Sequence, residues 1–295
     1  MNRMWSQFVQ SSQELYESRS VRFRENNKDL WLNAMKLKDG MNILELGCGG
    51  GIFCHRIKTF LPNARVTGLD RDEGHIEFAR AKSESLKIDC NFVIGDALNL
   101  PFADNSFDAC TSFTVAEHVE TDRFIGEQYR ILKLGGVLSV LQVKSSFNVS
   151  SNECIPTSPE ETALLNKAWK KAGDFDKENG IGTFTMNASD IPIAMEETGF
   201  KNVNVDFISI LQYAPDSADT SKELALHQIN INRIHALSSM AKALNIDPDC
   251  LTEPETQRLT DLINERFDKR IDKYLNGEKL WDMSTCTVMA VIGYK

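Results

Sequence analysis

Short apolar runs alternate with helical patterns from residue 41 to residue 143, and this alternation constrains the fold more than any other feature of the chain. Parallel strands need a long crossover connection, which is usually a helix, and the helices then cover both faces of the sheet. The pattern therefore predicts a doubly wound α/β fold. The expected strands are 41–46, 65–70, 90–94, 107–113 and 136–143, and the expected helices between them are 52–60, 73–86 and 122–132, the last ending at Gly135-Gly136.

The remaining segments predict additions to this core. Residues 1–38 are expected to form an N-terminal helical cap, and residues 39–211 the α/β core, with a helical excursion at about 147–187. Apolar residues at helical spacing within 212–285 predict a helical insertion, and 286–295 a final core strand. A further strand is expected at 203–211. Together with the five strands above and the final strand, it predicts a Rossmann-like sheet of seven mostly parallel strands. The insertion is expected to be a lid or a dimer interface, and the pattern leaves both open.

Composition and charge narrow the class of partner. The chain has 295 residues and a net charge of −9, so it lacks the cationic surface that nucleic acids require. We therefore expect a small-molecule ligand and no nucleic acid. The seven cysteines include no C-x-x-C pair, which suits a reducing compartment. The chain shows neither a signal-like start nor an apolar run of the roughly 18 residues that suggest a membrane span. We expect a cytoplasmic protein, with a homodimer as one arrangement.

A glycine-rich loop joins the first expected strand to the first expected helix. It reads Gly47-Cys48-Gly49-Gly50-Gly51 and is preceded by Glu45. Glycines let a ligand approach the backbone, and the free N–H groups at a helix start favour negative groups. A dinucleotide site requires G-x-G-x-x-G, but the third glycine position holds Ile52. The loop thus predicts a nucleotide-type ligand and argues against a dinucleotide.

Two further acidic residues follow strands of the expected sheet. Asp70 ends the second strand, where a carboxylate can accept hydrogen bonds from both hydroxyls of a ribose. Asp96 lies in the turn 95–98, which leads into Leu100-Pro101-Phe102 and then Ser106-Phe107-Asp108. Because ligands of such sheets bind at the carboxyl ends of the strands, these residues are expected to lie near the glycine loop.

Together these segments resemble class I S-adenosylmethionine (SAM)-dependent methyltransferases. They are similar in particular to the methyltransferase-11 branch, which includes the ubiquinone and menaquinone biosynthesis methyltransferases. The resemblance covers residues 40–145 well and the rest loosely. It implies SAM as cofactor, S-adenosylhomocysteine (SAH) as product, and methyl transfer to a small organic molecule. The acceptor atom, oxygen, carbon or nitrogen, stays open.

The resemblance also implies roles for single residues. Asp96 would accept from the adenine amino group, the Ala97 N–H would bond the ring, and Arg71 would pack on it. Phe113 and Thr114 would hold the methionine part, and the segment with Tyr16 and Arg19 would fold over the SAM carboxylate. The expected cofactor-binding residues are Tyr16, Arg19, Glu45, Gly47, Cys48, Gly49, Asp70, Arg71, Asp96, Ala97, Phe113 and Thr114.

The segment after the fourth expected strand separates subclasses of methyltransferase. It has neither an Asn/Asp-Pro-Pro-Tyr run nor the metal-binding aspartate of catechol-type enzymes, since Thr114 stands there, so we expect no metal. Glu117-His118-Val119 is similar to the family branch. His118 is a candidate general base because histidine titrates near neutral pH, although it could instead only orient the loop or the cofactor. Glu117 is the second catalytic candidate, and His55 and His75 are expected on the surface.

Other functions of the same fold stay open from the sequence. Aminopropyl transfer is one alternative, because a fold does not define a reaction. A catalytically silent SAM- or SAH-binding sensor or partner subunit is another. The glycine loop, Asp70 and Asp96 favour cofactor binding but do not by themselves establish turnover.

Overall fold

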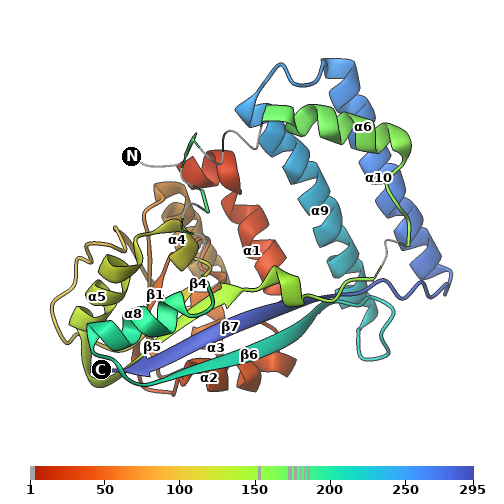
Figure 1. Ribbon diagram of the computed structural model, residues 1–295. Coiled ribbons are helices and arrows are strands. Elements are labelled where there is room, and N and C mark those ends of the chain that lie inside the picture. The colour runs from red at the N-terminus through yellow and green to blue at the C-terminus, as the bar shows by residue number, and fades with distance from the viewer. Residues whose placement is uncertain are drawn as a thin grey trace.

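The computed structural model describes residues 4–151, 154–171, 175, 178–179, 181–182, 184 and 187–295. Its centre is one sheet of seven strands in the order β3-β2-β1-β4-β5-β7-β6 (Figure 1). The first five strands are parallel, whereas β7 is antiparallel to both β5 and β6. The predicted mostly parallel, seven-stranded α/β sheet is therefore confirmed. The strands are β1 Asn42–Leu46, β2 Arg65–Asp70, β3 Asn91–Ile94, β4 Phe107–Phe113, β5 Leu132–Val143, β6 Lys201–Tyr213 and β7 Ser284–Tyr294.

Helices cover both faces of the sheet. Side chains alternate between the faces along a strand, so Ile43 and Leu44 enter two different hydrophobic clusters. One cluster packs residues of α2, α3 and α4 against the sheet, and the other packs residues of α5 and α8. The helices are α1 Ser12–Ser20, α2 Lys28–Met35, α3 Ile52–Phe60, α4 Glu73–Leu86, α5 Thr121–Ile131, α6 Pro159–Ala168, α8 Asp190–Thr198, α9 Lys222–Ile246 and α10 Glu253–Leu275, with a π-helical turn η1 at Trp5–Val9.

The structure corrects the predicted boundary between α5 and β5. The helix ends at Ile131, and β5 begins at once with Leu132, which pairs with Phe107. Gly135 and Gly136 therefore do not end the helix. They lie in an irregular part of β5, where the Gly135 N–H donates to the carbonyl of Lys295 and the Gly136 carbonyl accepts from the Lys295 N–H. Pairing with the end of the chain, which a local pattern does not reveal, decides this boundary.

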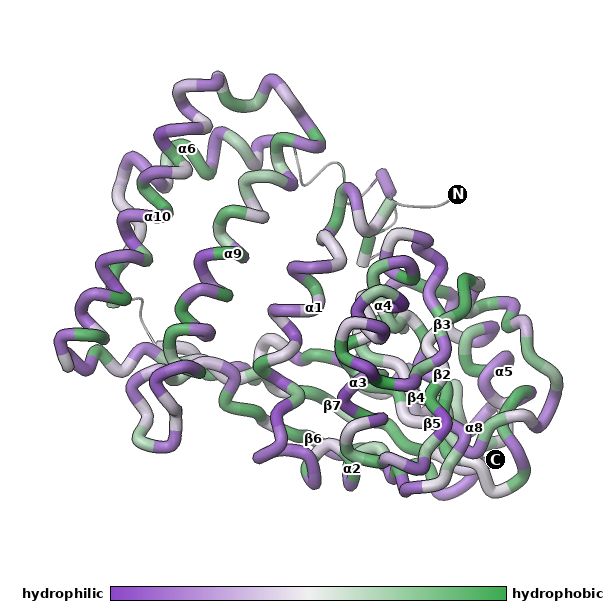
Figure 2. The backbone as a smooth tube through the Cα atoms, turned by 180° about the vertical axis from the view of Figure 1, so that it is seen from behind, coloured by the Kyte–Doolittle hydropathy of each residue, from purple (hydrophilic) through white to green (hydrophobic). Residues whose placement is uncertain are grey.

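The predicted helical insertion consists of α9 and α10, which lie between β6 and β7 in the chain. Ser221 caps α9, and Thr252 with Glu255 forms a capping box at the start of α10. A third hydrophobic cluster joins these two helices to α6, and Figure 2 shows hydrophobic and hydrophilic segments alternating along both. We call α6, α9 and α10 the helical arm. On its other side α9 contacts α1 and η1.

The structure addresses two further expectations in part, the excursion at 147–187 and the absence of a membrane span. The helix after Ser158 ends at Ala168, with a 3-10 turn at Trp169–Lys171, and part of the predicted excursion at 147–187 lies outside the described residues. Among the helices that the structure describes, none combines the length and apolar character needed to cross a membrane.

Candidate functional site

A cavity of about 670 Å³ lies at the carboxyl ends of β1, β2, β3 and β4. This is the edge where doubly wound sheets bind their ligands. Many of the predicted site residues meet there. Those that line the cavity are Arg19, Gly47, Gly49, Asp70, Arg71, Asp96, Ala97, Phe113, Thr114 and His118.

The glycine loop requires glycine at two positions for steric reasons. Gly47 has φ +66°, and a Cβ atom there would lie 2.4 Å from Cγ2 of Val115. Gly49 has φ +52°, and a Cβ atom would lie 2.5 Å from Cδ2 of Leu15. Any side chain would therefore be strained by the backbone and would collide with a neighbour. The backbone of the loop is left facing the cavity.

Asp70 is held rigidly beside this loop. Its Oδ2 accepts from the Gly49 N–H at 2.8 Å, and its Oδ1 accepts from the Asp72 N–H at 2.9 Å. Asp72 in turn caps α4 and accepts from the N–H and hydroxyl of Ser6. A carboxylate has about four lone-pair sites, so Asp70 keeps acceptor capacity for two ribose hydroxyls. The residues present fit the ribose of SAM.

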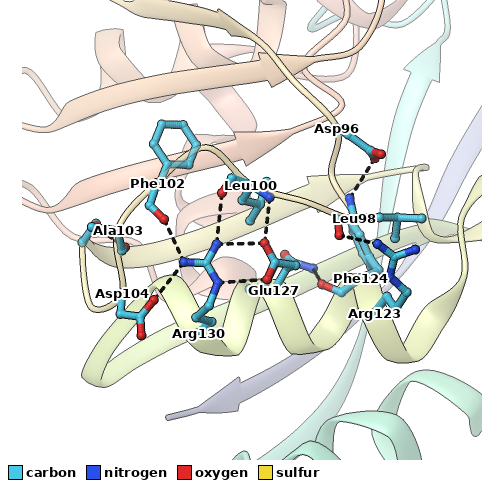
Figure 3. Close-up of polar contacts among 12 residues, drawn as sticks. Asp96, Leu98, Leu100, Phe102, Ala103, Asp104, Arg123, Phe124, Glu127 and Arg130 are labelled. Atoms are coloured by element: carbon cyan, nitrogen blue, oxygen red, sulfur yellow. Dashed lines mark hydrogen bonds and ion pairs between the residues drawn. The ribbon is translucent and has the colours of Figure 1, made fainter.

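The turn with Asp96 and Ala97 is fixed to α5 (Figure 3). Nη1 of Arg130 donates to the Phe102 carbonyl at 2.8 Å, and its Nη2 donates to the Leu100 carbonyl at 3.0 Å. The Leu100 N–H donates to Glu127 at 2.7 Å. Hydrogen bonds from Arg130 hold the pKa of Glu127 below its usual range, so this carboxylate stays charged. The arginine and the glutamate therefore clamp the segment that would contact adenine.

Replacing Arg130 by alanine is expected to weaken SAH binding about tenfold. The loop carbonyls of Leu100 and Phe102 would lose the guanidinium donor that holds them, and ordering the loop on binding would cost about 1.4 kcal/mol more. Calorimetric titration measures this change. Arg258→Ala removes an arginine from an exposed ion pair with Glu160 and serves as the control. Equal affinities of the two variants would contradict the clamp.

Arg19 and Thr114 form the opposite end of the cavity. Nη2 of Arg19 donates to the Thr114 hydroxyl at 3.0 Å, and the guanidinium lies 5.4 Å from the ring centre of Phe113. Burial, and then the charge of Arg22, lowers the pKa of Arg19 to about 10, so Arg19 remains charged at neutral pH. The guanidinium keeps further N–H donors for a carboxylate. These groups fit the methionine carboxylate of SAM.

Three predicted cofactor residues have side chains outside the lining of the cavity. The Tyr16 hydroxyl pairs with Nδ1 of His55 at 3.2 Å, and burial raises the pKa of Tyr16 to about 12. Glu45 is buried and accepts from the Cys54 thiol at 2.9 Å. The Cys48 side chain packs against Gly68 in the core. The expectation for Tyr16 is corrected, because its side chain points toward His55 and not into the cavity, whereas α1 presents Arg19 to the cavity.

Two histidines expected on the surface are buried. His55 is 1% exposed, and its Nε2 pairs with the Ser83 hydroxyl. His75 is 3% exposed, lines the cavity, and pairs with the hydroxyl of Ser12 at 2.8 Å. The burial arises from α1, which packs over α3 and α4. The helical patterns of α3 and α4 do not indicate that α1, which is distant in the sequence, covers them.

Aromatic residues complete the wall around His118. The ring of Trp5 lies 4.8 Å from the imidazole, edge to face, and Phe184 lines the same cavity. Trp5 lies within residues 1–38, where the sequence predicts an N-terminal helical cap whose aromatic residues could cover the active site. Its position in a helical cap before the sheet indicates that Trp5 can cover the site. Its contact with His118, however, depends on the tertiary fold.

His118 has a defined tautomer in this arrangement. Its Nδ1 accepts from the Gly182 N–H at 2.9 Å, so the neutral ring carries its proton on Nε2. Burial, and then the charges of Arg71 and Arg19, lowers the pKa of His118 to about 4. Glu117 does not line the cavity, and its buried Oε2 has no hydrogen-bond partner among the described residues. Burial raises the pKa of Glu117.

The segment that includes β1 to β5 is similar in sequence to known proteins. Residues 44–140 match the family model described as a methyltransferase domain. The chain is 36% identical over 123 residues to the demethylmenaquinone methyltransferase of Thermus thermophilus, a match that covers 41% of this chain and 54% of that protein. It is 39% identical over 109 residues to a sterol 24-C-methyltransferase of Gibberella zeae, covering 36% of this chain and 28% of that protein. The matches therefore span about half of these relatives or less.

The fold is also found in a solved structure. A phosphoethanolamine N-methyltransferase of Haemonchus contortus superposes with a TM-score of 0.53 at 15% identity, covering 99% of this chain and 60% of that one. The resemblance to methyltransferases that the motifs predict is therefore confirmed for residues 44–140, and the solved structure shows the same fold.

Proposed function

We propose that this chain binds SAM in the cavity at the sheet edge and transfers the methyl group to a small organic molecule, with release of SAH. The observation that supports this most is the order of groups along one cavity. The strand order β3-β2-β1-β4 places Asp96 after β3, Asp70 at the end of β2, the glycine loop after β1 and Thr114, which binds Arg19, after β4. That order matches adenine, ribose and methionine carboxylate.

SAM supplies a methyl group that its positive sulfur already makes electrophilic. The chain mainly has to orient the acceptor atom in line with this methyl and to exclude water. In the transfer the acceptor forms a bond to the methyl carbon, and the carbon–sulfur bond breaks with its electron pair left on sulfur. The proton lost by the acceptor passes to solvent. The side chains of Trp5, Leu15 and Phe113 contribute apolar surface around the site.

We assign His118 a catalytic role as a hydrogen-bond donor. With Nδ1 occupied by the Gly182 N–H, only the Nε2–H is available to the acceptor. To act as the general base considered in the sequence analysis, His118 would have to break its hydrogen bond with the Gly182 N–H. The aromatic contact with Trp5 supports a fixed ring orientation. Glu117 stays a proposed second functional residue: it adjoins His118, and its buried Oε2 has no hydrogen-bond partner among the described residues, but it does not line the cavity.

His118→Asn is expected to lower the methyl-transfer rate about tenfold, by the same factor at pH 6 and at pH 8. The reason is that a pKa of about 4 keeps His118 neutral across this range. Rates with labelled SAM, measured for both proteins at each pH, test this. A loss that changes with a midpoint near pH 6.5 would show instead that His118 acts as a titrating base.

We further propose that the helical arm acts as a lid. Contacts of α9 with α1 and η1 support this, because both N-terminal elements carry residues that line the cavity. A homodimer remains compatible with the lid. The cysteines are free thiols, which supports a reducing, cytoplasmic location.

Calorimetric titration with SAM and with SAH tests the first step of the proposal. We expect both to bind at one site, and failure of both to bind would refute it. Label transfer from methyl-labelled SAM to a deproteinised low-mass extract of the source cells tests the second step. Binding without any transfer would instead indicate a catalytically silent cofactor-binding protein.

A further inference from the structure

The last two strands of the sheet carry apolar side chains that remain exposed. β6 and β7 extend beyond the end of α8 (Figure 1). Phe207 of β6 pairs with Met289 of β7, which belongs to the hydrophobic cluster of α5 and α8. Opposite residues of an antiparallel pair point to the same face of a sheet, and so does every second residue of one strand. Val205, Phe207 and Leu211 therefore lie on the face that α8 packs against, yet they are 41%, 49% and 42% exposed.

The segment after β5 extends this apolar surface. The ring centre of Phe147 lies 5.8 Å from that of Phe207. The Val149 N–H donates to the Thr285 hydroxyl at 2.8 Å, and Thr285 pairs with Leu211 across the two strands. Phe147 and Val149 are both 63% exposed. We call the contiguous set of exposed apolar residues the β6 patch; it consists of Phe147, Val149, Val205, Phe207 and Leu211.

The polar side chains beside the patch are paired with groups of the same surface. The hydroxyls of Ser209 and Thr287 lie 3.1 Å apart, and the Thr287 hydroxyl also contacts the Phe147 carbonyl at 3.1 Å. The patch residues themselves carry no charge. The patch therefore offers no ion pair to a charged partner, and the surface that complements it is uncharged and apolar.

The outer edge of β6 is blocked to an added strand. The Phe207 N–H donates to the Asp206 carboxylate at 2.8 Å, and the Leu211 carbonyl accepts from Nη2 of Arg24 at 2.8 Å. Side chains of the same chain thus occupy backbone groups that a new strand would need. A partner can therefore pack on the face of β6 more readily than along its edge.

The size of the patch fits contact between two copies of the chain. From the exposures above, the five residues expose on the order of 500 Å², so two copies together would bury on the order of 1,000 Å². That total reaches the lower range of specific interfaces. In a two-fold contact each copy offers the same residues. Since Val205 and Leu211 lie on either side of Phe207 along the strand, a two-fold axis near Phe207 brings apolar side chains onto apolar side chains.

We infer that the β6 patch is the interface of a symmetric homodimer, in which two sheets pack face to face around Phe207. The net charge of −9 on each copy opposes association at long range, and salt screens this repulsion. The dimer is therefore expected to become more stable as the salt concentration rises. None of the patch residues lines the cofactor cavity, so the inference is independent of the proposed function.

Sedimentation velocity of the full chain, at concentrations from about 1 to about 100 μM, tests the dimer. We expect the average mass to rise with concentration from the 33.2 kDa of one chain toward twice that value. Phe207→Lys brings two like charges together at the two-fold axis and is expected to raise the dissociation constant at least tenfold. Leu134→Lys changes an exposed apolar residue at the start of β5, outside the patch, and is expected to have no effect.

A second measurement shows that the variants are folded. Both are expected to bind SAH within twofold of the unmodified protein, because neither residue lines the cofactor cavity. If the unmodified protein binds no SAH, circular dichroism replaces this check, so a failure of the proposed function leaves the test of the dimer intact. If Phe207→Lys does not fold, Val149→Lys at another exposed position of the patch takes its place.

Four results would overturn the inference. A single species of one chain's mass at every concentration would refute the homodimer. A dimer of Phe207→Lys as stable as that of Leu134→Lys would place the interface elsewhere. Weaker association at higher salt would show that charge pairs hold the two copies. A monomer that binds phosphatidylcholine vesicles, with binding lost in Phe207→Lys, would assign the patch to a lipid surface instead.

Discussion

Replacing Asp70 by alanine is expected to weaken SAM and SAH binding by about 100- to 10,000-fold. The carboxylate is placed to accept two charge-assisted hydrogen bonds from the ribose, each worth about 1.5–3 kcal/mol. It also fixes the glycine loop through the Gly49 N–H and the start of α4 through the Asp72 N–H. The substitution removes the ligand contacts and loosens the loop at the same time. Calorimetric titration of both ligands measures the loss.

A conservative variant separates these two effects. Asp70→Asn keeps one carbonyl oxygen as an acceptor and is expected to bind SAH with an affinity between those of the unmodified protein and Asp70→Ala. Asp89→Ala changes an exposed aspartate that does not line the cavity and is the matched control. Binding by Asp70→Ala within threefold of the control would show that the ribose does not lie over Asp70.

Arg270→Met is expected to lower the free energy of unfolding by about 3–5 kcal/mol. Breaking a buried ion pair by removing one partner leaves the other charge without compensation. Here two carboxylates, those of Asp216 and Asp282, would lose their partner. Water could not compensate their charges well, because Asp216 is 2% exposed and Asp282 is 13% exposed. Both join α10 to the segments around it, so the helical arm should lose its attachment to the sheet first. Denaturant unfolding followed by circular dichroism measures the change.

The control for this experiment is another arginine of the same helix. Arg258 pairs with Glu160 on the surface, and Arg258→Met is expected to cost less than about 1 kcal/mol. SAH binding by the folded fraction of Arg270→Met should stay close to that of the unmodified protein, since Arg270 lies outside the cofactor cavity. Similar losses of stability in the two variants would mean that the Arg270 network does not hold the arm.

Local patterns in the sequence were enough for the central sheet and much of the cofactor site. Strands β1 and β2 follow their apolar runs, because a buried parallel strand must be apolar on both faces. Gly47 and Gly49 stand where the backbone has positive φ, a requirement that a glycine pattern reveals directly. Asp70 and Asp96 come to the same edge because the ends of parallel strands meet there. These features depend on residues close together in the chain.

Other features depend on packing between distant segments. The turn of Tyr16 toward His55, the burial of His75 and the aromatic wall of Trp5 all require α1 and η1 to lie over the sheet edge. A separate cavity between the helical arm and the start of β7 combines Cys154, Tyr213, Ala236, Arg270 and Asp282, which no local pattern connects. The sequence thus determined the α/β core and a nucleotide-type site through short-range chemistry, and its resemblance to methyltransferases implied SAM as the methyl donor. Only the tertiary structure decided which side chains line the cavity at the sheet edge, because burial and charge pairing there are set by elements far apart in the chain.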